Sequence, residues 1–222
     1  IENRPLKGDF QGTSYNLRVF RFGAAQPGKP KAYMHAALHA DETPGMLILH
    51  HMLPKLQAAA EAGLIDGEIV VLPQANPLGG AQVMFGDTHI GRFDMASGQN
   101  HNRGWELLSP AVIADIEAVL SDDETANVAH IRRIIGAAVA ARQPSTVLER
   151  FRKEILQLSH DADIVFDIHC DDESDRHLFI IPEQWPDWED IARASRSAVA
   201  LTAADSGGGS YDECLSTVWT RL

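Results

Sequence analysis

Short apolar strand-like segments alternate with helix-like segments along most of this chain, and this order constrains its fold more than any other feature. Strands are expected at residues 14–22, 32–38, 68–72, 164–168 and 178–181. Helices are expected at residues 44–62, 109–141 (broken near 121–125), 146–160 and 188–203. Because strands that alternate with helices form a sheet covered by those helices, the sequence predicts an α/β layered fold.

The expected strand ends are where chemistry should be sought. In open α/β sheets, ligands bind outside the carboxyl ends of the strands. The segment 76–105 is rich in glycine and polar residues and shows no clear period. Connections of this length are uncommon in compact domains and often carry function. Polar residues that follow the strands, and this long segment, are therefore the first candidates for a site.

One histidine and one glutamate follow the expected strand 32–38. His39 comes directly after that strand, and Glu42 lies in the turn before the helix that begins with Pro44. His169 ends the later strand 164–168 in an equivalent place. Imidazole and carboxylate are suitable ligands for zinc, and catalytic zinc commonly takes three protein ligands and a water. His39, Glu42 and His169 thus form a candidate metal set with two histidines and one carboxylate.

This metal set has a plain structural alternative. A short His-x-x-Glu match occurs by chance about as often as it marks a site, and a histidine that ends a strand can simply bond a loop. Asp167 precedes His169 on the same strand. Strand alternation is taken to direct its side chain to the opposite face, so Asp167 is not counted as a ligand.

The segment 91–105 reads GRFDMASGQNHNRGW and contains Arg92, Asn100, Asn102 and Arg103. The planar guanidinium group of arginine binds carboxylates through two parallel hydrogen bonds. This loop could therefore hold a substrate carboxylate beside the metal set. The alternative is a solvated surface loop with incidental charges, which the general behaviour of loops favours.

Four short motifs occur in one order along the chain: HADETPG, NPLG, NHNR and DIHC. With this order, the sequence resembles the succinylglutamate desuccinylase/aspartoacylase branch of the zinc carboxypeptidase-like hydrolases. The resemblance implies a mixed central sheet with helices on both faces. It implies that one Zn²⁺ ion is bound by His39, Glu42 and His169, and that Asn102 and Arg103 hold the free carboxylate of the substrate. Arg92 is implied as the residue that polarises the scissile carbonyl.

The activity implied by this resemblance is zinc-dependent hydrolysis of the amide bond of a small, anionic N-acyl amino acid. The family's general base is a glutamate on a later strand, and Glu173, Glu183 and Glu213 do not fit that setting. Residues 1–222 are therefore expected to form one catalytic domain that is truncated, with the base and a small β domain beyond Leu222. Two alternatives stay open: a metallocarboxypeptidase that acts on peptides, and a non-catalytic domain that binds a metal or a ligand.

Charge and composition limit the partners. The chain has 19 Lys and Arg against 31 Asp and Glu, and its net charge of -12 argues against nucleic acid as the main partner. The apolar runs are too short to cross a bilayer, and no signal-peptide pattern is visible at the start. Two cysteines cannot form a disulfide framework. We therefore expect a cytoplasmic protein without a membrane partner, and homo-oligomerisation stays open.

Overall fold

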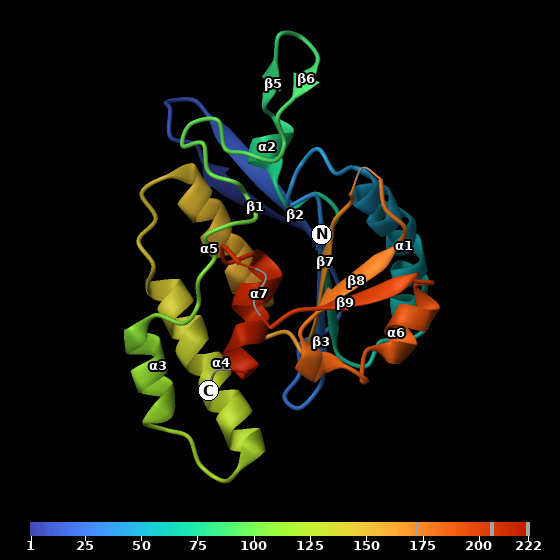
Figure 1. Cartoon of the computed structure of the whole chain (residues 1–222), viewed down its shortest axis with the longest axis vertical. Helices are drawn as coiled ribbons and strands as arrows, with labels where there is room; N and C mark the ends of the chain where they lie inside the picture. Colours follow the sequence, from blue (N-terminus) through green and yellow to red (C-terminus); the bar gives the residue numbers. More distant parts are fainter. Residues whose placement is uncertain (172, 205–206, 221–222) are drawn as a thin grey trace.

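The centre of the molecule is a mixed five-stranded sheet (Figure 1). The computed structural model describes residues 1–171, 173–204 and 207–220. The strand order is β1-β2-β4-β3-β7, with β1 (Glu2–Lys7), β2 (Ser14–Gly23), β3 (Lys31–Ala36), β4 (Glu68–Leu72) and β7 (Ile164–Ile168). β2 pairs antiparallel with β1 and β4, whereas β3 pairs parallel with β4 and β7. The carboxyl ends of β3, β4 and β7 therefore lie at the same edge of the sheet.

Helices and two small sheets complete the fold. The helices are α1 (Pro44–Glu61), α2 (Pro77–Gly80), α3 (Pro110–Glu117), α4 (Glu124–Ala141), α5 (Val147–Ser159), α6 (Glu189–Ala194) and α7 (Tyr211–Ser216), with short 3-10 turns η1 (Pro182–Gln184) and η2 (Thr217–Trp219). β5 (Val83–Met84) and β6 (Thr88–His89) form a hairpin that projects beyond α2, at the top of Figure 1. β8 (His177–Ile180) pairs parallel with β9 (Val199–Thr202). Within the described residues, no helix is both long and apolar enough to span a bilayer.

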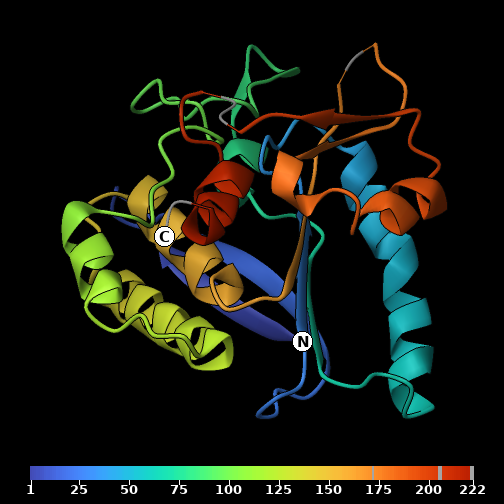
Figure 2. The same ribbon diagram turned by 60° about the horizontal axis from the view of Figure 1, so that its bottom comes forward.

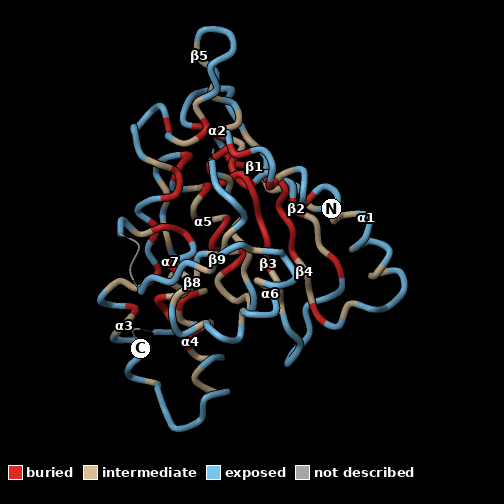
Figure 3. The backbone as a smooth tube through the Cα atoms, turned by 45° about the vertical axis from the view of Figure 1, so that its right-hand side comes forward, coloured by how far each residue is buried: buried red, intermediate tan, exposed pale blue. Residues whose placement is uncertain are grey.

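The two faces of the sheet bury different hydrophobic clusters, because successive side chains of a strand point to opposite faces. On β3, Tyr33 joins the larger cluster, which includes Ile135 of α4 and Phe151 of α5. Its neighbour Met34 joins the smaller cluster, which includes Leu49 of α1. Figure 2 shows α1 on one side of the sheet and α3, α4, α5 and α7 on the other, and Figure 3 shows the buried strands between them. The predicted mixed sheet with helices on both faces is confirmed.

Most predicted elements match the structure closely, and the differences have local causes. The strand expected to reach residue 38 ends at Ala36, because Ala37 adopts φ 58° and turns the chain out of the sheet. The opening segment, for which no element was predicted, forms β1 at the sheet edge. Pro5 lacks an N–H and is tolerated there because an edge strand leaves one side unpaired.

The helix predicted at residues 188–203 is wrong in its second half. α6 ends at Ala194, Arg196 turns the chain at φ 54°, and the following residues form β9. The short apolar run of β9 fits a strand or a helix equally well on periodicity alone. Pairing with β8, which the local sequence does not encode, decides the outcome.

Candidate metal centre

The parallel pairing of β3 and β7 brings the predicted metal residues together. Ala36 at the end of β3 lies opposite Ile168 at the end of β7. His39 follows the first strand, His169 follows the second, and Glu42 lies between β3 and α1. The ligand atoms of these three side chains all lie within 4.8 Å of one another, so they could hold a metal ion. We refer to these three residues as the metal group.

Glu42 lies between the two imidazole rings. Its Oε1 is 2.8 Å from Nδ1 of His39, and its Oε2 is 2.9 Å from Nδ1 of His169. The N–H of Cys170 donates to Oε2 over 2.8 Å and fixes the carboxylate further. The side chain of Glu42 is 8% exposed, that of His39 is 5% exposed and that of His169 is 29% exposed. One side of the group is therefore closed, while the His169 side is open to solvent.

The second nitrogen of each ring also has a partner. His39 Nε2 lies 2.8 Å from Oδ1 of Asn100, and His169 Nε2 lies 3.0 Å from Oδ1 of Asp167. Because these oxygens accept hydrogen bonds, they favour a proton on each Nε2. Nδ1, which bonds Glu42 in the metal-free protein, is then the nitrogen that can lose its proton and bind a metal ion. Metal-binding histidines commonly hold their other N–H in this way. The donor set thus fits a divalent cation bound through two Nδ1 atoms and a carboxylate.

The expectation that Asp167 points away from His169 is wrong. Residues two positions apart on a strand share a face, and the carboxylate of Asp167 contacts both His169 and His35. Asp167 is not one of the three side chains whose ligand atoms converge. It therefore lies behind the metal group and orients one of its members.

Electrostatics at this site favour a positive charge. Burial alone would raise the pKa of Glu42, but hydrogen bonds from His169 and His39 hold it well below its usual range. Burial alone would lower the pKa of His169, but Asp167 and Glu42 together raise it to about 10. Two carboxylates beside one imidazole provide the electrostatic setting that a divalent cation needs.

Arg92 reaches the same carboxylate from the long loop. Its Nη2 donates to Oε1 of Glu42 over 2.8 Å, and its side chain is 43% exposed. The backbone carbonyl of Arg92 accepts a hydrogen bond from the N–H of His101, 3.0 Å away. The loop thus holds a partly exposed guanidinium group at the rim of the metal group.

The predicted substrate-binding pair is Asn102 and Arg103, and the first of these lies beside His169. The Nδ2 atom of Asn102 is 3.3 Å from His169 Nε2, and its Oδ1 accepts from the N–H of Tyr211 over 2.8 Å. Asn102 is buried, whereas Arg103 is exposed and donates from Nη1 to the backbone carbonyl of Asn102. The structure therefore places Asn102 next to the metal group, whereas the side chain of the following residue, Arg103, is exposed and contacts none of the three candidate ligands among the described interactions.

Two segments distant in sequence support this loop, and the sequence analysis missed both of them. The N–H groups of Gly104 and Trp105 donate to the carbonyls of Gly208 and Gly209 over 2.9 Å each. Arg152 of α5 donates to the carbonyl of Arg103 over 2.8 Å and lies over the ring of Trp105. No local pattern could have shown these contacts, because they join residues about 50 or 100 positions apart.

The glutamates considered as general bases have other settings. Glu213 is the third residue of α7 and forms a capping box with Ser210. Glu183 lies in η1, and Glu173 lies in the connection before β8. None of them joins the metal group as far as the described residues go. The expectation of a base beyond Leu222 stays a prediction.

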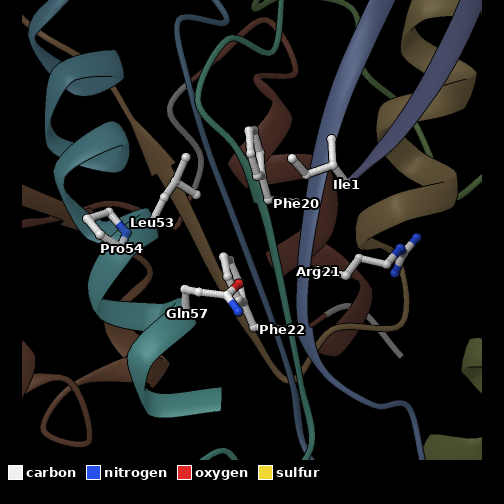
Figure 4. Close-up of a pocket in the computed structure, with 7 residues that line it drawn as sticks. All are labelled: Ile1, Phe20, Arg21, Phe22, Leu53, Pro54 and Gln57. Atoms are coloured by element: carbon white, nitrogen blue, oxygen red, sulfur yellow. The ribbon is translucent and has the colours of Figure 1, made fainter. Parts of the chain in front are cut away.

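A shallow pocket lies elsewhere, between α1 and β2 (Figure 4). Leu53, Pro54 and Gln57 of α1 face Phe20 and Phe22 of β2 there. The described lining residues include no histidine or carboxylate. This pocket is therefore separate from the chemistry of the metal group.

Comparison with known protein families shows to which of them this chain is related. The model of the succinylglutamate desuccinylase/aspartoacylase catalytic domain matches residues 28–211. The chain belongs to this family. The resemblance predicted from the four motifs is thus confirmed, and the family's members named desuccinylase and aspartoacylase are hydrolases. No curated protein matches the chain.

Solved structures show the same fold. A succinylglutamate desuccinylase/aspartoacylase family protein from Shewanella amazonensis SB2B is 24% identical, with a TM-score of 0.77, over 100% of this chain and 60% of its own. A protein of the same description from Shewanella frigidimarina NCIMB 400 is 23% identical, with a TM-score of 0.81, over 100% of this chain and 58% of its own. A protein described as a metallopeptidase, from Shewanella baltica OS155, is 19% identical, with a TM-score of 0.56, over 98% of this chain and 73% of its own. This chain thus spans about three fifths of the length of the first two.

Proposed function

We propose that this chain is the catalytic domain of a zinc-dependent hydrolase that cleaves the amide bond of a small N-acyl amino acid. One observation carries the proposal. The Nδ1 atoms of His39 and His169 converge on the carboxylate of Glu42, while both Nε2 atoms are held by acceptors. This arrangement, in a member of a hydrolase family, supports a catalytic rather than a structural metal site, because three protein ligands leave a coordination position open.

His39, Glu42 and His169 would hold the ion, one per chain. When bound, zinc would act as a Lewis acid, which polarises a carbonyl group and lowers the pKa of a bound water molecule to about 7. Asn100 and Asp167 would hold a proton on Nε2 of each imidazole, so that Nδ1 can bind the ion. The protein side of the centre is therefore organised before a substrate arrives.

Arg92 and Arg103 would act on the substrate. The partly exposed guanidinium group of Arg92 can donate to the carbonyl oxygen of the scissile amide, where negative charge develops during hydrolysis. Arg103, exposed beside Asn102, would bind a free carboxylate through its two-pronged donor group. These local cations allow a small anionic substrate in spite of the net charge of -12.

The substrate class follows from the family rather than from the geometry. Names such as succinylglutamate desuccinylase and aspartoacylase describe removal of an acyl group from an acidic amino acid. We carry this class over to the chain as part of the proposal, together with a cytoplasmic location.

A metallocarboxypeptidase is the second candidate. The fold likeness to the protein from Shewanella baltica described as a metallopeptidase supports it. Both enzymes would use the same metal group and the same grip on a free carboxylate. A non-catalytic metal-binding domain is the third candidate, and it would keep the metal group without turnover.

Elemental analysis tests the metal site first. We expect nearly one zinc per purified chain after zinc is supplied, and loss of that zinc in His39→Ala and His169→Ala. His51→Ala, an exposed residue of α1, is the matched control and should keep the metal. Full occupancy in the two ligand variants would contradict the assignment, and absence of zinc from the wild type would remove the hydrolase proposal.

Turnover separates the three candidates. Zinc-loaded protein that carries the predicted general base should release free amino groups from N-succinylglutamate or N-acetylaspartate and leave peptides intact. Release of C-terminal residues from peptides would favour the carboxypeptidase. Zinc binding without turnover would favour the binding domain only in protein that carries this base. For the active protein, Arg103→Ala should raise KM for substrates with a free carboxylate, and an unchanged KM would exclude the anchoring role.

A further inference from the structure

A buried polar chain lies directly behind the metal group. His35 of β3 is 0% exposed, and its Nε2 lies 2.7 Å from Oδ1 of Asp167 on the neighbouring strand. Its Nδ1 lies 3.0 Å from the hydroxyl of Tyr33, which is also 0% exposed. The same Oδ1 atom of Asp167 contacts Nε2 of His169. Tyr33, His35 and Asp167 therefore form a continuous path that ends on a predicted metal ligand.

The direction of the hydrogen bonds along this path is set by the groups themselves. Burial and the nearby Asp167 raise the pKa of Tyr33 well above its usual range, so its hydroxyl keeps its proton. That hydroxyl can donate to Nδ1 of His35, which leaves the His35 proton on Nε2, facing Asp167. Asp167 then accepts from His35 on one side and from His169 on the other.

Packing and register hold this path in place. His35 lies directly opposite Asp167 in the parallel register of β3 and β7. The ring of Tyr211 packs against His35 with centroids 4.7 Å apart. A buried histidine is often only a core residue whose polar atoms are satisfied. Here, however, its partner is the oxygen that orients a metal-binding ring, so a change at His35 should reach that ring.

We propose that His35 is a positioning residue of the metal centre, which holds Asp167 so that His169 keeps its proton on Nε2 and offers Nδ1 to the metal. The inference rests on the proposed metal site. It concerns residues that do not touch the ion or the substrate. Its effect is therefore expected on metal affinity, without loss of the fold.

Two substitutions at one position test the donor role of His35. His35→Leu removes the donor and keeps an apolar side chain in the buried space. His35→Gln restores an N–H donor at about the reach of Nε2. Zinc dissociation constants are measured by competition with a chromophoric chelator, and thermal unfolding of the metal-free proteins in EDTA reports the fold. We expect about 10- to 100-fold weaker zinc binding for His35→Leu, the range seen when partners of metal ligands are lost, and recovery to within about threefold for His35→Gln.

Tyr33→Phe gives a milder variant, which keeps the ring and removes only the hydroxyl. It should weaken zinc binding about three- to tenfold, less than loss of His35 itself, and it carries the test if His35→Leu fails to fold. His160→Leu is the matched control, because His160 bonds the carbonyl of Leu156 in α5, outside this path. Its zinc affinity should stay within about twofold of the wild type.

Several results would overturn the inference. Wild-type zinc affinity in both His35→Leu and Tyr33→Phe would show that the path does not reach the metal. Equal weakening by His35→Gln and His35→Leu would show that packing, not the N–H donor, matters. If either of these results is found and the wild-type protein binds zinc, the proposed function survives and only this inference falls. If the wild type binds no zinc, both fall.

Discussion

At the scale of single residues, Glu42 is the residue on which the candidate metal centre converges. Its two carboxylate oxygens contact both imidazole rings, the guanidinium group of Arg92 and the N–H of Cys170. A buried carboxylate with this many donors is strongly stabilised in its charged form. For zinc binding, the negative charge and the acceptor geometry of Glu42 should therefore matter more than the size of its side chain.

Glu42→Gln should weaken zinc binding by more than about 100-fold, beyond the range for partners of metal ligands. The amide is uncharged. Unlike a carboxylate oxygen, its NH₂ group can neither accept a hydrogen bond nor coordinate a metal ion. Chelator competition measures the zinc dissociation constant. Glu61→Gln, on the exposed end of α1, is the control and should bind zinc as the wild type does. Comparable affinities in the two variants would contradict the role of Glu42 as a ligand.

His101 gives a pH-dependent prediction. Its ring is 0% exposed, and burial lowers its pKa from 6.5 to about 4, although Asp94 opposes the shift. Between these values the unfolded chain binds a proton that the folded chain does not, so stability falls as pH decreases. For metal-free protein, His101 should account for the loss of roughly 3 kcal/mol of unfolding free energy between about pH 6.5 and pH 4.

His101→Met isolates this effect, because methionine does not titrate. Urea unfolding of both proteins in EDTA, from pH 7.5 to 4, measures the free energy of unfolding. The wild type should lose more stability than the variant as pH falls through this window. Parallel curves for the two proteins would show that the folded and unfolded chains protonate His101 alike.

At the scale of elements, α5 holds the loop that carries the predicted substrate residues. Arg152 donates to the carbonyl of Arg103 over 2.8 Å, and its guanidinium lies 5.7 Å from the centre of the Trp105 ring. Arg150, two positions earlier on the same helix, bonds the carbonyl of Lys7 and the carboxylate of Asp9 instead. One helix thus supports the site through one arginine and the sheet edge through another.

Arg152→Met should raise KM of the active protein roughly 10- to 150-fold, because the hydrogen bond from this charged group holds Arg103 in place and such bonds contribute about 1.5–3 kcal/mol. Arg150→Met is the matched control, which should lower the melting temperature without raising KM. Steady-state kinetics and thermal unfolding of both variants provide the comparison. Equal KM values in the two variants would place substrate binding away from this loop.

At the scale of the whole molecule, metal binding and folding should be coupled. The three candidate ligands come from two strand ends far apart in sequence, so the unfolded chain cannot present them together. Zinc at about 100 times its dissociation constant should therefore add roughly 2.7 kcal/mol to the unfolding free energy. For a chain of this size that corresponds to a rise in melting temperature of about 5–11 °C.

Differential scanning fluorimetry with zinc and with EDTA checks this shift. His39→Ala should show the same melting temperature in both conditions, because its site is incomplete. An equal rise in the wild type and in His39→Ala would mean that zinc stabilises the protein at some other place.

Elements with a strong local pattern and a clear end could be predicted from the sequence alone. The strands predicted at 68–72 and 164–168 match β4 and β7, and the helix predicted at 44–62 matches α1 to within one residue. His39, Glu42 and His169 could be singled out because a polar residue directly after a buried strand stands out in any α/β pattern. The four ordered motifs identified the family.

Which side chains meet depends on contacts between distant segments. The β9 strand, the contact of Asp167 with His35 and His169, and the support of the loop by Arg152 all depend on pairing between distant segments. Periodicity reports which face of an element is buried, but it carries no information about the element that covers that face. The candidate ligands could therefore be predicted from the sequence, whereas the residues that hold them in place emerged only from the packed sheet.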